Sequence, residues 1–339
     1  MPYQKKFGSK KNKNLYSFVR EFHKGANRPK IIKKDQPKNT EYLIKKPDMT
    51  PSVHELLPAE EKISVFKNKY LAMKEVLCGE FIRWIAPLCA PKYRLFKSKQ
   101  AESEEKEWFA GAKFNYKFVD SQEGFFPIPG QYKVNGYPFK NLTVEVPTDE
   151  SIQHKEIVGL GVAAVFRYIL GRNDCHNGNW GFAEMENHFQ VMLVDFGECL
   201  IDTQNSSRLS QTELDEESQL ITDDIMNLIR IVFENEENDP IPLPEEFYKS
   251  DRYRKEIIDT IEQLHALTPE ELYKFIDLHL QGAKNQREWI YSEIHAGIEH
   301  LHRLLMIYQK NQRKRTIDEV EHKETHQEQP LLKKSTPRG

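Results

Sequence analysis

Two stretches of the chain carry hydrophobic residues with a helical pattern. Residues 51–88 show apolar positions at helical spacing, which predicts one helix with a single buried stripe. The stripe consists of Met73, Leu77, Phe81, Trp84 and Leu88. Residues 151–171 are apolar on nearly every side, with Ser151 as a candidate N-cap and Gly171 at the end. A helix of this second kind is buried on all faces.

Strand-like runs surround these helices, and a long helical region follows them. The runs are 41–47, 90–97, 108–119 and 189–197. Residues 203–224 are polar and acidic and predict a loop. Residues 225–312 have helical periodicity, and the sequence Thr268-Pro269 with Glu271 is typical of a helix start. Strands that come first and helices that come later predict an α+β protein with two lobes.

The predicted organisation has four parts. Residues 1–40 form a basic, partly disordered N-terminal arm, and residues 41–119 form an N-lobe of mixed strands and helix. Residues 120–312 form a largely helical C-lobe. Residues 313–339 are charged and poor in large apolar side chains, which predicts a disordered tail.

Charge is distributed unevenly along a chain of 339 residues whose formal net charge is −3. Between Lys5 and Lys38 the cations far outnumber the two acidic residues, Glu21 and Asp35. Such a block favours an anionic lipid or an inositol polyphosphate as a partner, with nucleic acid a weaker candidate. The alternative is a solvated arm that binds nothing.

The cysteine pattern and the hydropathy favour a cytosolic protein. The four cysteines, Cys78, Cys89, Cys175 and Cys199, form no CxxC pair and have no metal-ligand spacing with histidine. No N-terminal signal peptide and no transmembrane run is predicted. The cytosol in question need not be that of the cell that makes the protein.

The motif with the clearest chemistry follows the second helix. Asp174 and Asn179 share one short loop, and Asp195 ends an apolar strand, followed by Gly197. Phosphoryl transfer from ATP requires Mg²⁺ held by oxygen ligands and a carboxylate that orients the acceptor. We predict Asp174 as the catalytic base and Asn179 and Asp195 as Mg²⁺ ligands, with Gly197 permitting a sharp turn. The alternative is a set of turn-forming and capping residues without chemistry.

The pattern D-x-H-x-x-N followed by D-F-G resembles that of phosphatidylinositol 3-/4-kinases and HipA-type kinases. The segment 170–198 is most similar to remote kinase-like effectors of intracellular bacteria such as Legionella. The resemblance implies a bilobal, atypical protein-kinase-like fold, ATP and Mg²⁺ as cofactors, and Asp174, Asn179 and Asp195 in the roles given above. It also places His176 where the lipid kinases carry a histidine that assists proton transfer; the alternative is a structural histidine.

Kinases also need a strand lysine for the donor phosphates and a helix glutamate that holds it. Residues 41–47 offer Lys45 and Lys46, which point to opposite faces of a strand, and we favour Lys45. The following helix offers Glu75 and Glu80 as ATP-site residues. The resemblance favours Glu75, whereas the apolar periodicity favours Glu80, which borders the stripe.

The sequence therefore predicts an Mg-ATP-dependent phosphotransferase with a protein or phosphoinositide acceptor. No G-x-G-x-x-G loop precedes Lys45 and no A-P-E segment follows Asp195, which argues against an ordinary protein kinase. The alternatives are a pseudokinase or ATP-binding interaction module, a kinase-fold enzyme that transfers AMP, and a helical interaction protein whose motif is accidental.

The C-terminal tail adds one further expectation. Residues 318–330 are rich in Glu and Gln, with Leu331 and Leu332 shortly after. This composition resembles the glutamate-rich translocation signals of type IV-secreted effectors, and the resemblance implies a bacterial effector delivered into host cytoplasm. An ordinary solvated tail is the alternative.

Overall fold

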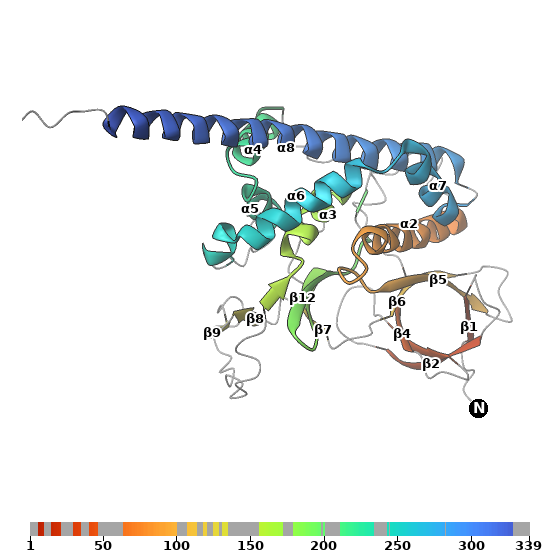
Figure 1. Cartoon of the computed structure of the whole chain (residues 1–339). Helices are drawn as coiled ribbons and strands as arrows, with labels where there is room; N and C mark the ends of the chain where they lie inside the picture. The colour runs from red at the N-terminus through yellow and green to blue at the C-terminus, as the bar shows by residue number, and fades with distance from the viewer. Residues whose placement is uncertain are drawn as a thin grey trace, which may run out of the picture.

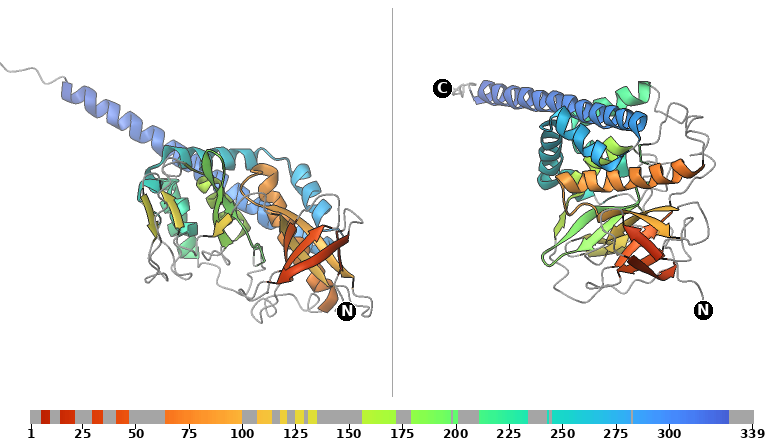
Figure 2. Two further views of the ribbon diagram at one scale, coloured as in Figure 1. Left: turned by 90° about the horizontal axis from the view of Figure 1, so that it is seen from below. Right: turned by 90° about the vertical axis from the view of Figure 1, so that its right-hand side faces the viewer.

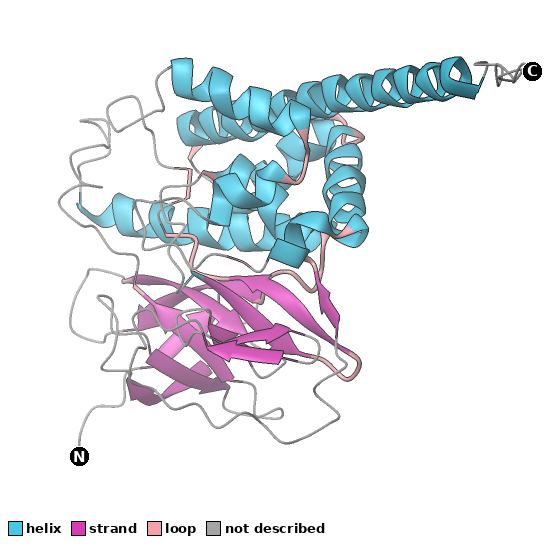
Figure 3. Ribbon diagram, turned by 90° about the vertical axis from the view of Figure 1, so that its left-hand side faces the viewer, coloured by secondary structure: helices cyan, strands magenta, loops and turns pink. Residues whose placement is uncertain are grey.

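The fold is described from a computed structural model of the chain. The described residues are 6–9, 15–21, 30–34, 41–46, 64–99, 107–113, 118–120, 125–128, 131–134, 156–171, 179–197, 199–200, 211–233, 243, 245–281 and 283–327. Strands gather on one side of the molecule and helices on the other (Figure 3). This segregation confirms the predicted α+β, two-lobed class.

The N-terminal part is a closed antiparallel barrel of six strands in the order β1-β2-β3-β4-β6-β5. The strands are β1 (Lys6–Ser9), β2 (Leu15–Glu21), β3 (Lys30–Lys34), β4 (Glu41–Lys45), β5 (Lys92–Lys99) and β6 (Trp108–Lys113). Apolar side chains from four of them fill the barrel: Ile32, Tyr42, Ile44, Phe96 and Phe109. Closure leaves the sheet without a free edge.

The basic N-terminal segment contains strands where we predicted an arm. Three of its stretches are β1, β2 and β3, and each pairs with its neighbours in the barrel. The sequence shows no strand signal here because these strands are short, and because β1 pairs with β5, which lies far away along the chain. In β3 the apolar Ile32 is fully buried while Lys33 remains partly exposed.

Helix α2 (Ser64–Ile85) lies between the barrel and the helices of the C-terminal part (Figure 1). It packs on β5 and β6 on one side and on C-terminal helices on the other. Residues 70–79 are therefore buried on every face, whereas we predicted a single stripe. Two residues of the predicted stripe are not buried: Trp84 is 38% exposed and Leu88 is 42% exposed.

A second, smaller sheet begins the C-terminal part. Its strand order is β10-β12-β11-β7, with β10 parallel to β12 and the other pairs antiparallel. The strands are β7 (Phe118–Asp120), β10 (Glu156–Val158), β11 (Trp180–Glu184) and β12 (His188–Leu193). The hairpin β8 (Phe125–Ile128) and β9 (Gln131–Val134) pairs separately.

Helix α3 (Leu160–Leu170) is the buried helix that the sequence predicts, but it begins later than expected. Residues 156–158 are strand β10 instead, and the predicted N-cap Ser151 lies outside the described residues. The start is capped from a distance, since Glu256 accepts hydrogen bonds of 2.9 Å from the amides of Gly159 and Gly161. Burial raises the pKa of the Glu256 carboxyl, and these hydrogen bonds oppose that shift.

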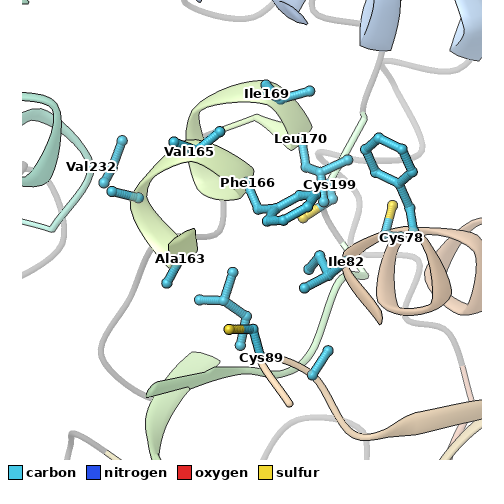
Figure 4. Packing of buried hydrophobic residues seen from close by; sticks show 14 of the residues in the cluster. Cys78, Ile82, Cys89, Ala163, Val165, Phe166, Ile169, Leu170, Cys199 and Val232 are labelled. Atoms are coloured by element: carbon cyan, nitrogen blue, oxygen red, sulfur yellow. The ribbon is translucent and has the colours of Figure 1, made fainter. Parts of the chain in front are cut away.

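Six further helical segments complete the C-terminal part. They are α4 (Gln211–Asp223), α5 (Asn227–Phe233), the 3₁₀ turn η5 (Glu245–Lys249), α6 (Asp251–His265), α7 (Pro269–His279) and α8 (Lys284–Gln327). Three of them, α5, α6 and α8, pack on α3. Thr268 and Glu271 form the predicted start of α7, as a complete capping box. Between α2 and α3, Phe166 lies close to Ile82 and Cys199 in the main core (Figure 4).

Two predicted coil segments contain helix. The acidic stretch expected as a loop holds α4, because Asp215 and Glu216 are exposed while Ile221 is buried and α4 packs on α8. The charged tail continues α8 as far as Gln327, and α8 extends beyond the helices that it covers (Figure 2). Extending an existing helix needs no new nucleation, so polar residues can continue it. Among the described residues, no helix is long and apolar enough to cross a membrane.

The close packing of α3 on α6 generates a stability prediction. A Cβ added at Gly161 would lie 2.5 Å from the Tyr253 carbonyl oxygen and 2.8 Å from Glu256 Cβ. We expect Gly161→Ala to lower the free energy of unfolding by about 1–3 kcal/mol, measured by urea denaturation, because the backbone must shift.

The matched control is Gly297→Ala on α8, which also faces α3. Its new Cβ would meet Ile169 at 3.4 Å, an ordinary contact. This variant should be neutral or stabilised by about 0.5–1 kcal/mol, as for alanine replacing glycine within a helix. Equal losses of stability in the two variants would contradict the close α3–α6 contact.

Candidate active site

The centre of the site is a lysine that bridges the two parts of the molecule. Lys45 is the last residue of β4 and faces away from the barrel interior. Its ammonium group lies 3.9 Å from Glu75 Oε1 on α2 and forms a close ion pair with the Asp195 carboxylate beyond β12. The side chain of Lys45 is 15% exposed, so both pairs lie in partly desolvated surroundings.

Of the two candidate lysines and two candidate glutamates, the structure brings Lys45 and Glu75 together. Lys46 points away and pairs at 3.1 Å with Glu107 near the surface. Glu80 accepts a 2.8 Å hydrogen bond from the Tyr93 amide and pairs with Arg83. The periodicity that favoured Glu80 was misleading, because α2 is buried on the Glu75 side as well.

The D-F-G segment turns at its aspartate. Asp195 has φ of 56°, in the left-handed region that residues other than glycine, asparagine and aspartate rarely adopt. Gly197, which we expected to supply the turn, is not among the residues with positive φ. Its lack of a side chain has a different consequence, because an added Cβ would approach Lys45 Nζ to 3.2 Å.

Backbone hydrogen bonds fix this segment to neighbouring elements. The Leu193 amide donates to the Cys89 carbonyl at 2.8 Å, and the Val194 amide donates to the Asn179 carbonyl at 2.8 Å. The Leu200 amide donates to the Leu170 carbonyl at 2.9 Å, which joins the segment to the end of α3. The carboxylate of Asp195 is thus held by a frame that includes both lobes.

Asn179 and Asp195 line the same pocket. The pocket is small and open to solvent, and it is lined by Phe166, Arg167, Leu170, Gly171, Asn179, Leu193, Val194, Asp195, Phe196 and Cys199. Asn179 is buried, whereas the Asp195 side chain is 38% exposed. An amide oxygen and a carboxylate on one pocket are the kind of donor pair that Mg²⁺ takes from proteins, with phosphate and water oxygens completing the shell.

Asp174 and His176 lie in residues 172–178, outside the described part of the chain, so their predicted roles stay predictions. Within the described residues, no three His, Cys, Asp or Glu side chains gather into a metal-binding cluster. Asn179 and Asp195 supply only two ligand side chains. A magnesium site in a phosphotransferase needs no more, because phosphate and water oxygens complete the coordination shell.

Two residues of the site were missed by sequence reasoning. Tyr93 on β5 reaches Asp195 with its hydroxyl group, and Arg167 on α3 lines the pocket with its guanidinium 4.7 Å from the Phe233 ring centre. Burial raises the pKa of the Cys78 thiol to about 12, so this thiol on α2 stays protonated. A tyrosine and an arginine in apolar runs gave no signal that they face the site.

No known family model matches the sequence, and no curated protein matches it. Among solved structures, the chain is similar to the Helicobacter pylori proinflammatory kinase CtkA, with 16% identity, 82% of this chain and 94% of that chain covered, and a TM-score of 0.40. It is also similar to the Rio2 kinase from Chaetomium thermophilum, solved as an ADP/Mg²⁺-phosphoaspartate complex, with 11% identity, 84% and 72% coverage and a TM-score of 0.33. The Mycobacterium tuberculosis PknI kinase domain gives 10% identity, 84% and 95% coverage and a TM-score of 0.29.

These likenesses are remote, and they transfer no residue's role to this chain. The fold class rests on the chain's own architecture. An antiparallel N-terminal sheet with one helix joins a largely helical C-terminal part. A strand lysine, a helix glutamate and the aspartate of D-F-G meet between the two parts. The chain therefore has a kinase-like bilobal fold, as the sequence predicts.

The position of Lys45 between two carboxylates generates a second prediction. Lys45→Met should lower the free energy of unfolding by about 1–3 kcal/mol, because the buried Glu75 carboxylate loses its cation. Lys46→Met is the matched control, and we expect a change within about 0.5 kcal/mol because its ion pair is largely exposed. Both are measured by urea denaturation; equal effects would contradict the placement of Lys45.

Proposed function

We propose that the chain is an Mg-ATP-dependent phosphotransferase. The observation that carries the proposal is the meeting of Lys45, Glu75 and Asp195 between the two lobes. The three residues come from distant parts of the sequence, and each is of the type that phosphoryl transfer requires. A helical interaction protein would have no reason to bury a lysine between two carboxylates beside a pocket that Asn179 and Asp195 share.

Each residue has a distinct task in this proposal. Lys45, held by Glu75, neutralises the donor phosphates, which are the largest charge that the site must bind. Asp195 and Asn179 would hold Mg²⁺, which supplies charge neutralisation of the transferring phosphoryl group when it is bound. Asp174 orients the acceptor hydroxyl and takes its proton, and His176 assists that transfer. These last two roles rest on the motif alone.

The acceptor is a protein or a phosphoinositide. The D-x-H-x-x-N motif favours the lipid, because it resembles that of phosphatidylinositol 3-/4-kinases. The cations of residues 5–38 favour an anionic acceptor surface or an inositol polyphosphate. A protein acceptor remains the second candidate, because the resemblance to effector kinases and HipA-type kinases is not restricted to lipids.

We also propose that the protein is a bacterial effector delivered into a host cell by a type IV system. The support is the Glu- and Gln-rich composition of residues 318–330. This part of the proposal is independent of the catalytic site, since residues 318–330 are not among the residues that line the pocket.

The effector role is tested by deleting residues 319–339. The deletion keeps Arg315, which donates to the Asp223 carbonyl at 3.2 Å, so the packing of α8 on α4 should persist. We expect full Mg-ATP turnover in the purified variant and loss of delivery in a translocation-reporter assay. Normal delivery of the shortened protein would refute the signal and leave the enzyme untouched.

The enzymatic proposal is tested with Asp195→Ala. Wild-type protein should bind ATP in an Mg²⁺-dependent manner and form ADP when protein or phosphoinositide-vesicle panels are added. Asp195→Ala should lose at least about 100-fold in turnover, because one metal ligand and its charge are removed. Asp259→Ala is the control, since Asp259 is an exposed carboxylate paired with Lys255 on α6.

The outcomes separate the alternatives. Mass spectrometry of the acceptor distinguishes an added phosphate from an added AMP. Mg-ATP binding without any product would favour the pseudokinase or ATP-binding module. Failure of the wild-type protein to bind Mg-ATP at all would contradict the phosphotransferase.

A further inference from the structure

Tyr93 contacts the D-F-G segment in two ways. Its hydroxyl oxygen accepts a hydrogen bond of 3.2 Å from the Asp195 amide. Its ring packs against Phe196, with 5.5 Å between ring centres. A single side chain of the N-terminal barrel therefore touches both the proposed metal ligand and the residue that follows it.

The position of Tyr93 is itself tightly fixed. Its amide donates to Glu80 Oε1 at 2.8 Å, and its side chain is almost fully buried. The ring lies so close to α2 that a Cβ added at Gly79 would be 2.2 Å from Tyr93 Cδ2. Burial raises the pKa of the Tyr93 hydroxyl well above its ordinary value, so the group stays protonated.

Asp195 needs such a contact because of its backbone conformation. Its φ of 56° lies in the left-handed region, which L-residues adopt at a cost. The hydrogen bond that the Asp195 amide donates to the Tyr93 hydroxyl offsets part of that cost. It also opposes rotation of the peptide group between residues 194 and 195. The carboxylate is then kept beside Lys45, on the pocket that it shares with Asn179.

We infer that Tyr93 is a positioning residue that holds Asp195 in its metal-binding conformation through the hydroxyl-to-amide hydrogen bond. The metal role of Asp195 rests on the proposed function, whereas the hydrogen bond itself does not. The arrangement makes the magnesium affinity of the C-terminal part depend on β5 and α2 of the N-terminal part. Glu80 accepts a hydrogen bond from the Tyr93 amide, so it helps to position Tyr93 and does not contact the nucleotide.

Tyr93→Phe tests this inference, because it removes the hydroxyl and keeps the ring. The first readout is hydrogen–deuterium exchange of peptides spanning residues 193–200 in the metal-free protein, resolved to the Asp195 amide. We expect this amide to exchange about tenfold faster in the variant, as for the loss of one hydrogen bond.

The second readout is the Mg²⁺ concentration dependence of ADP binding, measured by calorimetry. We expect the apparent Mg²⁺ affinity to fall by about 3- to 10-fold, because a smaller fraction of the protein holds Asp195 in the binding conformation. ADP binding without Mg²⁺ should be unchanged, since Lys45 and Glu75 are not altered. A purely structural role for Tyr93 would weaken both equally.

The matched control is Tyr253→Phe. Tyr253 is also buried, and its hydroxyl donates to the Ile157 carbonyl at 3.2 Å, on the α6 side of the core. This variant loses a comparable hydrogen bond and should change neither the Asp195 amide exchange nor the Mg²⁺ dependence. If Tyr93→Phe does not fold, Glu80→Ala releases the Tyr93 amide instead and should speed Asp195 exchange in the same direction.

The failures are distinguishable. Unchanged exchange of the Asp195 amide in Tyr93→Phe, or a Mg²⁺ dependence equal to that of the wild type, overturns the inference and leaves the phosphotransferase standing. Wild-type protein without Mg²⁺-dependent ADP binding overturns the proposed function. The exchange experiment then still decides whether Tyr93 holds Asp195.

Discussion

The arrangement depends on one ammonium group shared by two carboxylates. Lys45 comes from the barrel, Glu75 from α2 and Asp195 from the loop after β12, so the Lys45–Asp195 ion pair joins the two lobes while Glu75 holds the lysine from within the N-terminal one. A carboxylate as buried as Glu75, with 3% of its side chain exposed, requires a cation nearby. The same electrostatic requirement that stabilises the junction leaves a positive group where donor phosphates would bind.

Helix α2 makes this junction possible. It is buried between the barrel and the C-terminal helices, so the side chain of Glu75 is enclosed rather than solvated. Its glycine at position 79 allows Tyr93 to approach, and Tyr93 in turn reaches Asp195. Packing of one helix therefore determines the relative positions of the lysine, the glutamate and the aspartate.

Much of the fold could be predicted from local pattern, and the failures have physical causes. The all-apolar α3 and the capping box of α7 were visible because each depends on a few adjacent residues. Strands β1 to β3 were missed because they are short and because β1 pairs with β5, far away in the sequence, and α4 was missed because its packing on α8 is tertiary. The late start of α3 depends on Glu256, far away in sequence.

The residues of the candidate site that belong to a sequence motif could be predicted. The residues that only the three-dimensional packing brings to the site could not. Asp195 and Asn179 follow from the D-x-H-x-x-N and D-F-G pattern, and the pocket that they share was not visible in it. The choice of Glu75 over Glu80 followed from resemblance, while periodicity indicated the opposite, because periodicity assumes one buried face. Tyr93 belongs to no motif, and only the three-dimensional contact with Asp195 identifies it.

The most direct test of the central claim is a crystal structure of the chain with Mg²⁺ and a non-hydrolysable ATP analogue. We expect Lys45 to remain paired with Glu75 while contacting the phosphates, with oxygen atoms of Asp195 and Asn179 bound to the same metal ion. A nucleotide bound elsewhere, or Lys45 turned away from both Glu75 and the phosphates, would contradict the account.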